Sequence, residues 1–461
     1  MEPASSHTNM KPRHFAIVLL STFVIPATSF AVERPNILVF YLDDMGYGQP
    51  GCYGGTLAPT PNMDSLAAGG MRFTDGYVSA CVCSPSRVGL LTGRYQSRTG
   101  HDANSEGKSS AGRELLLSET TIAQRLKALG YTTGIFGKWH VGATSPEFLP
   151  AARGFDESFG TTGNLGETAG SFYRGKDKVP DPEGAPITSP IFAREAAGFI
   201  ERHRAEPWLL YLPFNAVHSP TVATESVLKR FANLPPRDQA YAALISEADD
   251  AIGAVLAKLR ELKLEESTLI FVISDNGGAA AQAEMGGLRG RKWLVWEGGI
   301  RVPWIAAWKG RIPAGRVSSE PVIQLDVLPT ALAAAGGEVK PEWQLDGVNL
   351  LPLLEGKASK LEREALYWRF GVQYAVRKGD WKLVKPGLVD KPMLVNLAAD
   401  RGEQTDLTAQ HPEKAADLQA LWDRWNGDNQ PPRWEDKRWN DGNTSKPARK
   451  SKEPRSKPRG I

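Results

Sequence analysis

Residues 36–48 read NILVFYLDDMGYG, an apolar run that ends in two adjacent aspartates. A short run rich in Ile, Leu, Val, Phe and Tyr, without a helical period, is typical of a β-strand that is buried on both faces. Similar runs recur along the chain, at 131–136, 208–214, 268–274 and 302–307. Their recurrence predicts one large sheet, with 36–42 as its first strand.

Helical patterns lie between these runs, at 61–68, 119–129, 191–203, 237–262 and 326–335. At the start of the first pattern Thr60 is in the capping position, and Pro61 takes the first helical position, where its missing N–H is tolerated. Strands that alternate with helices form a largely parallel sheet covered on both faces. The sequence therefore predicts an α/β fold in which helices flank a large, mostly parallel sheet.

The pattern changes near residue 366. Short strand-like segments then follow one another before a last helical pattern, and we expect strands at 366–370, 374–377, 381–384 and 393–396 and a helix at 412–425. Consecutive short strands favour a small antiparallel sheet. We therefore expect a large domain over 32–355 and a smaller C-terminal α+β domain over 356–430.

The N-terminal residues 1–31 have the composition of a cleavable signal peptide. They combine basic residues, a short apolar stretch at 15–25 and the small residues Ser29 and Ala31. The apolar stretch is shorter than the roughly 20 residues of a membrane-spanning helix. We therefore expect a secreted or periplasmic protein without stable membrane insertion; an uncleaved membrane anchor is the alternative interpretation.

Residues 431–461 are expected to form a basic, disordered tail. The stretch 446–459 holds seven Lys or Arg and one Glu and has no large apolar residue. Because the formal charge of the chain is +3, the remainder carries −3. A body of that charge does not have the composition of a nucleic-acid-binding protein. Nothing in the sequence fixes an oligomeric state.

Ionisable and polar residues follow four of the predicted strands, and they are Asp43, Asp44, Lys138, His140, His218, Asp275 and Asn276. In a doubly wound sheet, ligands bind beyond the carboxyl ends of the strands. These side chains are therefore expected to meet at one edge of the sheet. Any one of them is also compatible with an ordinary turn, where Asp and Asn are common, but the four strand ends together favour a site.

Four of these residues offer hard oxygen ligands: Asp43, Asp44, Asp275 and Asn276. Such a set suits Ca²⁺ or Mg²⁺, whereas zinc prefers His and Cys. Adjacent carboxylates repel each other and need a cation between them where they are buried. The sequence therefore predicts a divalent cation at the sheet edge.

The segment 83–94 reads CSPSRVGLLTGR. It matches the signature of the type I sulfatase family, C-x-P-S-R followed by L-T-G-R, at every defined position. The chain also resembles this family in the segments 36–48, GKWH at 137–140, RGFD at 153–156, SDNG at 274–277 and EGGIRVP at 297–303 with Lys292 before it. The resemblance extends from about 36 to 407 and implies an arylsulfatase-like protein with an alkaline phosphatase-like fold.

The resemblance implies that Cys83 is oxidised to formylglycine (3-oxoalanine) by a separate maturation enzyme that reads this motif; Cys81 lies two residues too early. It also implies that the modified Cys83 joins the four oxygen ligands around Ca²⁺, with Mg²⁺ as the alternative. An aldehyde hydrate has two hydroxyls on one carbon, so one can attack sulfur and the other can then expel sulfate. Pro85 suits a first helical turn, so Cys83 is expected just before a helix that runs to about residue 91.

By position in the family motifs, Arg87 holds the aldehyde hydrate, and Lys138 and Lys292 neutralise the sulfate oxygens. His140 is the expected base for sulfate release, and His218, with Lys292, is the expected acid for the leaving alkoxide. The implied substrate-binding residues are thus Lys138, His218 and Lys292.

The expected function is hydrolysis of sulfate monoesters on aryl compounds or, because export suits polymer degradation, on carbohydrates. We expect loops at 96–114, 144–190 and 368–374 to set the selectivity. Two alternatives stay open at this point. One is a phosphodiesterase or phosphonate hydrolase of the same fold, and the other is a catalytically inactive homologue that binds glycans.

Overall fold

The computed structural model describes residues 34–105, 111–165, 171–182, 185–387, 391–436 and 438–439, together with Met1 and Ala4. The expected signal peptide at 1–31 otherwise lies outside the described residues, as does the tail from 440 onward. No helix within these described ranges is both long enough and apolar enough to cross a bilayer.

The large sheet is built around β1 (Asn36–Leu42). Within the described part of the chain it has ten strands in the order β11-β2-β10-β9-β1-β8-β4-β5-β6-β7. The other strands are β2 (Met71–Phe73), β4 (Thr132–Lys138), β5 (Glu157–Thr161), β6 (Phe172–Arg174), β7 (Asp177–Val179), β8 (Trp208–Pro213), β9 (Thr268–Ser274), β10 (Trp304–Ala307) and β11 (Arg316–Ser318). The central strands β9, β1, β8, β4 and β5 run parallel, which confirms the predicted mostly parallel sheet.

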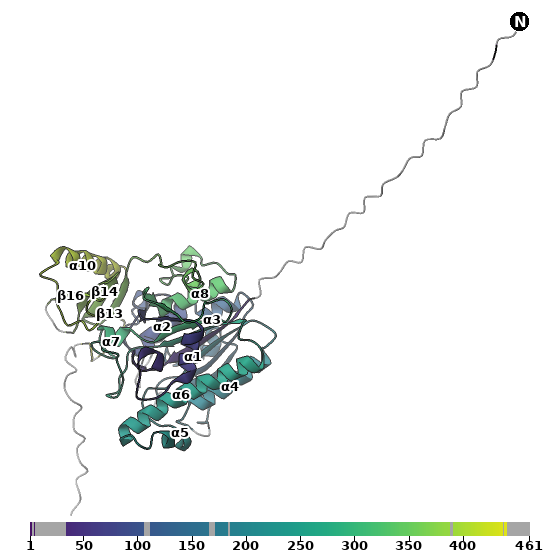
Figure 1. Cartoon of the computed structure of the whole chain (residues 1–461), viewed down its shortest axis with the longest axis horizontal. Coiled ribbons are helices and arrows are strands. Elements are labelled where there is room, and N and C mark those ends of the chain that lie inside the picture. Colours follow the sequence, from purple (N-terminus) through teal and green to yellow (C-terminus); the bar gives the residue numbers. More distant parts are fainter. Residues whose placement is uncertain are drawn as a thin grey trace, which may run out of the picture. The chain divides into compact units, whose positions relative to one another are not determined.

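Alternate residues of β1 enter two hydrophobic cores. Leu38, Phe40 and Leu42 pack with the helices α1 (Pro61–Gly69), α4 (Ser189–Arg202), α5 (Glu225–Arg230) and α6 (Pro236–Glu261). Ile37, Val39 and Tyr41 pack with the second set, α2 (Cys83–Thr92), α3 (Ile122–Lys127), α8 (Val327–Ala334) and α9 (Leu351–Leu354). Figure 1 shows α4 and α6 side by side. Because successive strand residues point to opposite faces, one apolar run supplies both cores.

The C-terminal part forms the predicted antiparallel sheet, from β13 (Leu366–Phe370), β14 (Gln373–Lys378), β15 (Trp381–Lys385) and β16 (Met393–Asn396), with α10 (Pro412–Gly427) packed on it (Figure 1). The apolar face of this small sheet shares a hydrophobic core with residues of the large domain, among them Tyr77 and Ile300. A buried ion pair joins Lys382 of β15 to Glu297 of α7 (Glu297–Ile300) at 2.8 Å. The expected boundaries at 355 and 430 stay predictions.

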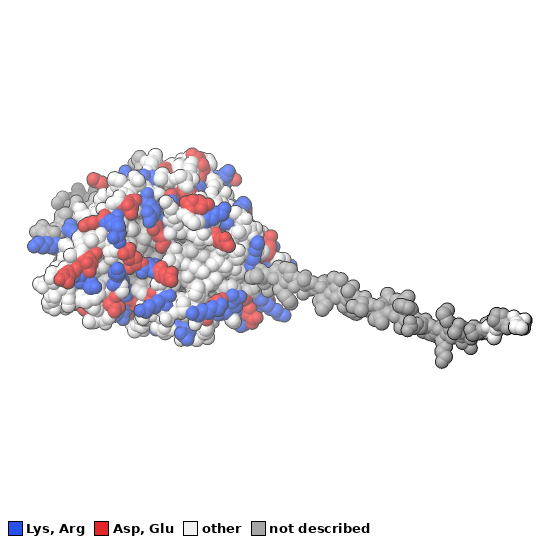
Figure 2. Space-filling model, turned by 90° about the horizontal axis from the view of Figure 1, so that it is seen from above, with Lys and Arg blue, Asp and Glu red and all other residues white. Residues whose placement is uncertain are grey.

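The remaining elements are short. They are the paired strands β3 (Gly76–Tyr77) and β12 (Val322–Ile323), and the 3₁₀ helices Gly51–Tyr53, Gln96–Thr99, Pro146–Phe148, Pro150–Arg153, Gln324–Asp326 and Pro341–Trp343. On the face in Figure 2, acidic and basic side chains are interspersed over the body.

Residues 431–436 and 438–439 lie against the body, although the sequence places them in the expected disordered tail. The backbone N–H of Arg433 donates to the carbonyl of Gly100 at 2.9 Å, and the Trp434 indole donates to the carbonyl of Asn104 at 3.1 Å. The difference arises because these partners lie on a distant segment, which the Pro-rich and charged composition of 431–439 does not reveal.

Candidate active site

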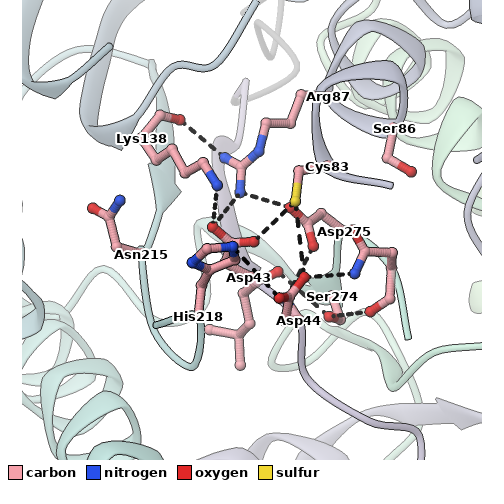
Figure 3. Close-up of polar contacts among 12 residues, drawn as sticks. Asp43, Asp44, Cys83, Ser86, Arg87, Lys138, Asn215, His218, Ser274 and Asp275 are labelled. Atoms are coloured by element: carbon pink, nitrogen blue, oxygen red, sulfur yellow. Dashed lines mark hydrogen bonds and ion pairs between the residues drawn. The ribbon is translucent and has the colours of Figure 1, made fainter. Parts of the chain in front are cut away.

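The polar residues predicted at the strand ends meet in one largely buried cluster, of which Figure 3 labels Asp43, Asp44, Lys138, His218 and Asp275. Asp43 and Asp44 follow β1, Lys138 ends β4, and Asp275 and Asn276 follow β9. Cys83 and Arg87 come from the first turns of α2, one helical turn apart and therefore on the same face. His140, His218 and Lys292 complete the set of predicted residues around the cluster.

The acidic side chains lie close enough to share one cation. Ligand atoms of Asp43, Asp44, Cys83 and Asp275 all lie within 4.8 Å of one another, and all four residues are buried. The buried Oδ1 atom of Asn276 accepts no hydrogen bond from the described residues, while its Nδ2 atom donates to Asp44 at 2.7 Å. Three carboxylates and a carboxamide oxygen are hard donors that fit Ca²⁺ or Mg²⁺.

Three basic side chains pair with these carboxylates. Arg87 contacts Asp275 at 2.8 Å and Asp43 at 3.5 Å. Lys138 forms a short ion pair with Asp43, and Lys292 contacts Asp44 at 2.6 Å. When all three carboxyls are ionised, the three basic side chains balance their charge.

The same contacts shift the pKa values of the carboxyls in opposite directions. Burial alone would raise the pKa of Asp43, but Lys138, His218 and Arg87 together lower it well below its usual range. Burial and the neighbouring Asp43 raise the pKa of Asp275 to about 7. At neutral pH, Asp275 thus holds its proton part of the time unless another positive charge enters the cluster.

The thiol of Cys83 is not activated as a nucleophile. Burial, with Asp275 and Asp43 nearby, raises its pKa well above the usual value, and Sγ donates a hydrogen bond to Asp43 at 3.3 Å. Reactive cysteines instead lie in electropositive places that lower the thiol pKa. The raised pKa therefore favours the protonated thiol in an unmodified Cys83.

Helix α2 begins one residue earlier than predicted, at Cys83 itself. The backbone N–H of the next residue, Ser84, donates to Oδ1 of Asn104 at 3.0 Å, and all ten residues of the helix are buried. Cys83 is therefore held in a regular first turn.

His218 presents one ring nitrogen to the cluster. Its Nδ1 atom contacts the carbonyl of Ser219 at 2.7 Å, and because a carbonyl only accepts, Nδ1 carries the proton. Its Nε2 atom lies 3.7 Å from Asp44. For His140, burial and then Lys138 and Arg87 lower the pKa well below its usual value, so this imidazole is neutral.

Two of these residues have strained backbones. Asp44 has a φ of 63° and His140 one of 57°, in the left-handed region that residues other than glycine rarely adopt. Such strain persists only where the surroundings enforce it, and it gathers at functional sites. In Asp44 it is supported by a hydrogen bond from the backbone N–H to Asp275 at 3.1 Å.

A cavity of about 350 Å³ opens onto the cluster and is lined in part by Asp44, His218 and Lys292. Sequence reasoning missed four of its other residues, which are Asn104, Asn164, Trp293 and Arg438. Asn104 and Asn164 fall in loops expected to set selectivity, and Asn164 accepts a hydrogen bond from Lys138 at 2.6 Å. Nothing in the sequence indicated Trp293 or Arg438.

Comparison with known proteins identifies the family. The family model described as Sulfatase matches residues 35–337, and that described as N-sulphoglucosamine sulphohydrolase, C-terminal, matches 289–424. The chain is 35% identical over 401 residues to N-acetylgalactosamine-6-sulfatase of Sus scrofa, covering 80% of this chain and 75% of that protein. It is 37% identical over 396 residues to arylsulfatase A of Homo sapiens, covering 77% and 76%.

A solved structure, Ps i-CgsB in complex with k-i-k-neocarrahexaose, superimposes with a TM-score of 0.80 at 30% identity, covering 87% of this chain and 95% of that one. The family match spans well over half of the chain and includes the strands that carry the buried cluster. The chain belongs to the type I sulfatase family and is a hydrolase of sulfuric esters.

Proposed function

We propose that this protein hydrolyses sulfate monoesters of carbohydrates with a formylglycine made from Cys83 and a divalent cation, Ca²⁺ in the first instance. The observation that carries the proposal is the position of Cys83, whose side chain lies within 4.8 Å of the ligand atoms of Asp43, Asp44 and Asp275. A separate maturation enzyme would supply the oxidation. A protein with this activity would act outside the cytoplasm, in line with the expected signal peptide.

The cation would be held by Asp43, Asp44, Asp275, Asn276 and the modified residue 83. Because three basic side chains balance the three carboxylates once these are ionised, a divalent ion would give the site the positive charge that an anionic ester needs. The formylglycine hydrate would supply the attacking hydroxyl and the second hydroxyl that expels sulfate.

The chain's own basic residues explain how the sulfate is held. Lys138 and Lys292 are buried and directed at Asp43 and Asp44, so their ammonium groups border the place where the sulfate oxygens must sit. Positive groups fixed there stabilise charge that develops in the transition state. Arg87, held by Asp275 and by the carbonyl of Lys138 at 2.9 Å, keeps the base of the site rigid.

Proton transfer falls to the two histidines. The Nε2 atom of His218 faces the pocket, so a protonated His218 can donate to the leaving alkoxide. His140 is buried and neutral, and it can therefore accept the proton when sulfate is released.

Two of the similar proteins support a carbohydrate substrate, whereas arylsulfatase A is named for aryl esters. N-acetylgalactosamine-6-sulfatase acts on a sugar sulfate by its name, and Ps i-CgsB is described with a bound oligosaccharide. The pocket of about 350 Å³ is of the size that takes a small ligand such as a sugar ring.

The first test is the chemistry of residue 83. Mass spectrometry of the peptide that contains Cys83, from protein made in a host with a maturation enzyme, should find the aldehyde in place of the thiol. Cys83→Ala should lower sulfatase activity at least about a thousandfold. Cys81→Ala is the matched control and should keep the wild-type activity. Full activity in Cys83→Ala would defeat the mechanism, and an intact thiol would favour the glycan-binding alternative.

The second test compares a sulfate monoester and a phosphate diester of the same phenol. We expect the sulfate ester to be hydrolysed with the higher kcat/KM. A preference for the phosphate diester by orders of magnitude would make the protein a phosphodiesterase of the same fold.

A further inference from the structure

The wall of the active-site pocket is completed by a residue from the C-terminal segment. Arg438 lines the same cavity as Asp44, His218 and Lys292. It is half-buried, and its guanidinium forms no ion pair with any residue that the structure describes. Lys138 and Lys292 each have a carboxylate partner, whereas the charge of Arg438 is not cancelled in this way.

Contacts on both sides fix the segment that carries Arg438. Before it, the Trp434 ring packs edge-on against His101, with the centroids 4.8 Å apart, and the guanidinium of Arg433 donates to the carbonyl of Glu114 at 2.8 Å. After it, the ring of Trp439 lies against Phe370, with the centroids 6.3 Å apart. The position of Arg438 at the pocket is therefore built by the fold.

Trp293 determines how far Arg438 lies from the catalytic cluster. The Arg438 guanidinium lies 4.9 Å from the centroid of this indole, and the Lys292 ammonium lies 5.3 Å from the same centroid. The sum of these two distances is the largest separation that the two cations can have. Substituents on one sugar ring, or on two neighbouring rings, can bridge that span.

The backbone of Trp293 shows that this arrangement is enforced. Its φ is 72°, an unfavourable value for a bulky residue. Two hydrogen bonds hold it there, from its N–H to the carbonyl of Cys81 at 2.9 Å and from the Gln373 amide to its own carbonyl at 3.0 Å. The indole is thereby held in contact distance of both cations.

We propose that Arg438 binds a second anionic group of the substrate, a sulfate or a carboxylate on the same or an adjacent sugar, while Lys292 faces the sulfate ester that is hydrolysed. The proposal rests on the proposed sulfatase function and narrows its substrate to polyanionic saccharides. A guanidinium presents paired N–H donors that match both sulfate and carboxylate oxygens. Arg438 is thus a specificity residue outside the reacting centre.

The test uses competition against one reporter substrate. Matured wild-type protein, Arg438→Gln and Arg438→Lys hydrolyse 4-methylumbelliferyl sulfate, which has a single anionic group. Saccharides are added as competitors: N-acetylgalactosamine 6-sulfate as the one-anion reference, its 4,6-disulfate for the sulfate arm, and the 6-sulfated sugar linked to glucuronate for the carboxylate arm. The competitor that binds more tightly shows whether the second anionic group is a sulfate or a carboxylate.

We expect the wild type to bind one of the two-anion competitors roughly tenfold or more tightly than the reference, as a charged hydrogen bond supplies. Arg438→Gln should remove this preference while kcat/KM for the aryl sulfate stays within about twofold, and Arg438→Lys should keep part of it. Arg204→Gln, on the surface beyond α4, is the matched control and should behave as wild type.

Three results would overturn the proposal: no preference for a second anion in the wild type, an unchanged preference in Arg438→Gln, or an equal loss of aryl sulfatase activity in that variant, which would indicate a structural role. Failure of the proposed function is recognised separately, because the wild type would then release sulfate neither from the reporter nor from the sulfated saccharides themselves. In that case calorimetric titration with the same saccharides still measures what Arg438 binds.

Discussion

Lys292 touches both the acidic cluster and the pocket, through its ion pair with Asp44. Replacing it with alanine removes a fixed positive charge from the place proposed for the sulfate oxygens. We expect kcat/KM of matured Lys292→Ala to fall by about 10²–10³, as for the loss of one donor that stabilises transition-state charge. Steady-state kinetics measure this. Lys309→Ala, on the exposed surface, is the control, and equal losses in both variants would contradict the role.

Asp275 should make binding of the proposed cation depend on pH. Its pKa of about 7 means that the free site must release a proton to bind the ion, so below that pH the apparent affinity should weaken by about tenfold per pH unit. Calorimetry with Ca²⁺ in buffers of different ionisation enthalpy measures both the affinity and the proton release. Asp275→Asn should bind more weakly, and its affinity should no longer change with pH in this way. A wild-type affinity that is flat between pH 5.5 and 7 would refute this assignment.

Removing the proposed cation with a chelator should lower the stability of the folded protein. A ligand that binds only the folded protein stabilises it by about 2.7 kcal/mol at 100 times its Kd. We therefore expect added Ca²⁺ to raise the Tm of the chelated protein and Asp275→Asn to respond less at the same concentration. Differential scanning calorimetry decides the point.

At the scale of elements, Gly89 shows how tightly α2 is packed. A Cβ at Gly89 would fall against the Ser79 hydroxyl and 3.0 Å from a methyl carbon of Leu325. Gly89→Ala should therefore destabilise the protein by about 1–3 kcal/mol, although alanine is the better helix former. Denaturant unfolding measures the change.

Gly198, inside α4, is the matched control. There a Cβ would meet only the guanidinium of the exposed Arg202, at 3.2 Å. Gly198→Ala should stabilise the protein by roughly 0.5–1 kcal/mol, because the backbone of the unfolded chain loses freedom. Changes of the same sign in the two variants would contradict the packing of α2.

The elements that could be predicted are those with a strong local pattern. Strand 268–274 has the predicted limits, and α6 differs from the prediction by one residue at each end. Helix α3 starts at Ile122 instead of 119, because the side chain of Thr121 caps it in a reciprocal arrangement with Gln124. Strand β10 begins after Pro303, which has no N–H for the ladder.

Strands β5 to β7 were not predicted. They are short, β6 and β7 carry several exposed residues, and their sequences, ESFGT, FYR and DKV, have little apolar alternation. They exist because β5 adds to the edge of β4 and the hairpin follows. Pairing of this kind depends on the tertiary fold, and no local pattern in the sequence reveals it.

For the molecule as a whole, a buried ionic network joins the small sheet to α7 of the large domain. Lys382 lies 2.8 Å from both Glu297 and Glu403, and all three side chains are buried. Burial and the neighbouring Glu297 raise the pKa of Glu403 to about 7, although Lys382 opposes the shift. In Glu297 the contacts with Lys382 and Arg301 overcome burial and lower the pKa to about 2.

This network predicts a pH-dependent stability. Between pH 4.5 and 7 the folded protein holds the Glu403 proton that the unfolded chain has lost, so the contribution of this group falls as pH rises through the window. Glu403→Gln keeps the neutral form, and its free energy of unfolding should fall less over that range. Urea unfolding at pH 5 and pH 7 measures the difference. Glu297 contributes stability that is lost only as pH falls below about 4.5, towards its lowered pKa. It therefore does not obscure the change due to Glu403 between pH 5 and pH 7.

The part of the active site that lies at strand ends or in the signature motif could be predicted from the sequence. Asp43, Lys138 and Asp275 lie at the carboxyl ends of strands whose register the parallel sheet fixes, so their meeting follows from topology. Trp293 and Arg438 come from a loop and from the C-terminal segment, and only the packed chain brings them to the same cavity. The residues that determine substrate specificity are therefore much harder to derive from the sequence than the residues that carry out the reaction.

The complete burial of α2 bears on when the protein can be activated. Cys83, Pro85 and Arg87, the residues that the proposed maturation enzyme would have to recognise, are all buried in the folded chain. Another protein could bind this motif only before the surrounding strands have assembled. Under the proposed function, aldehyde formation would therefore compete with folding, and a chain that folded before it was oxidised would keep its thiol for as long as it stayed folded.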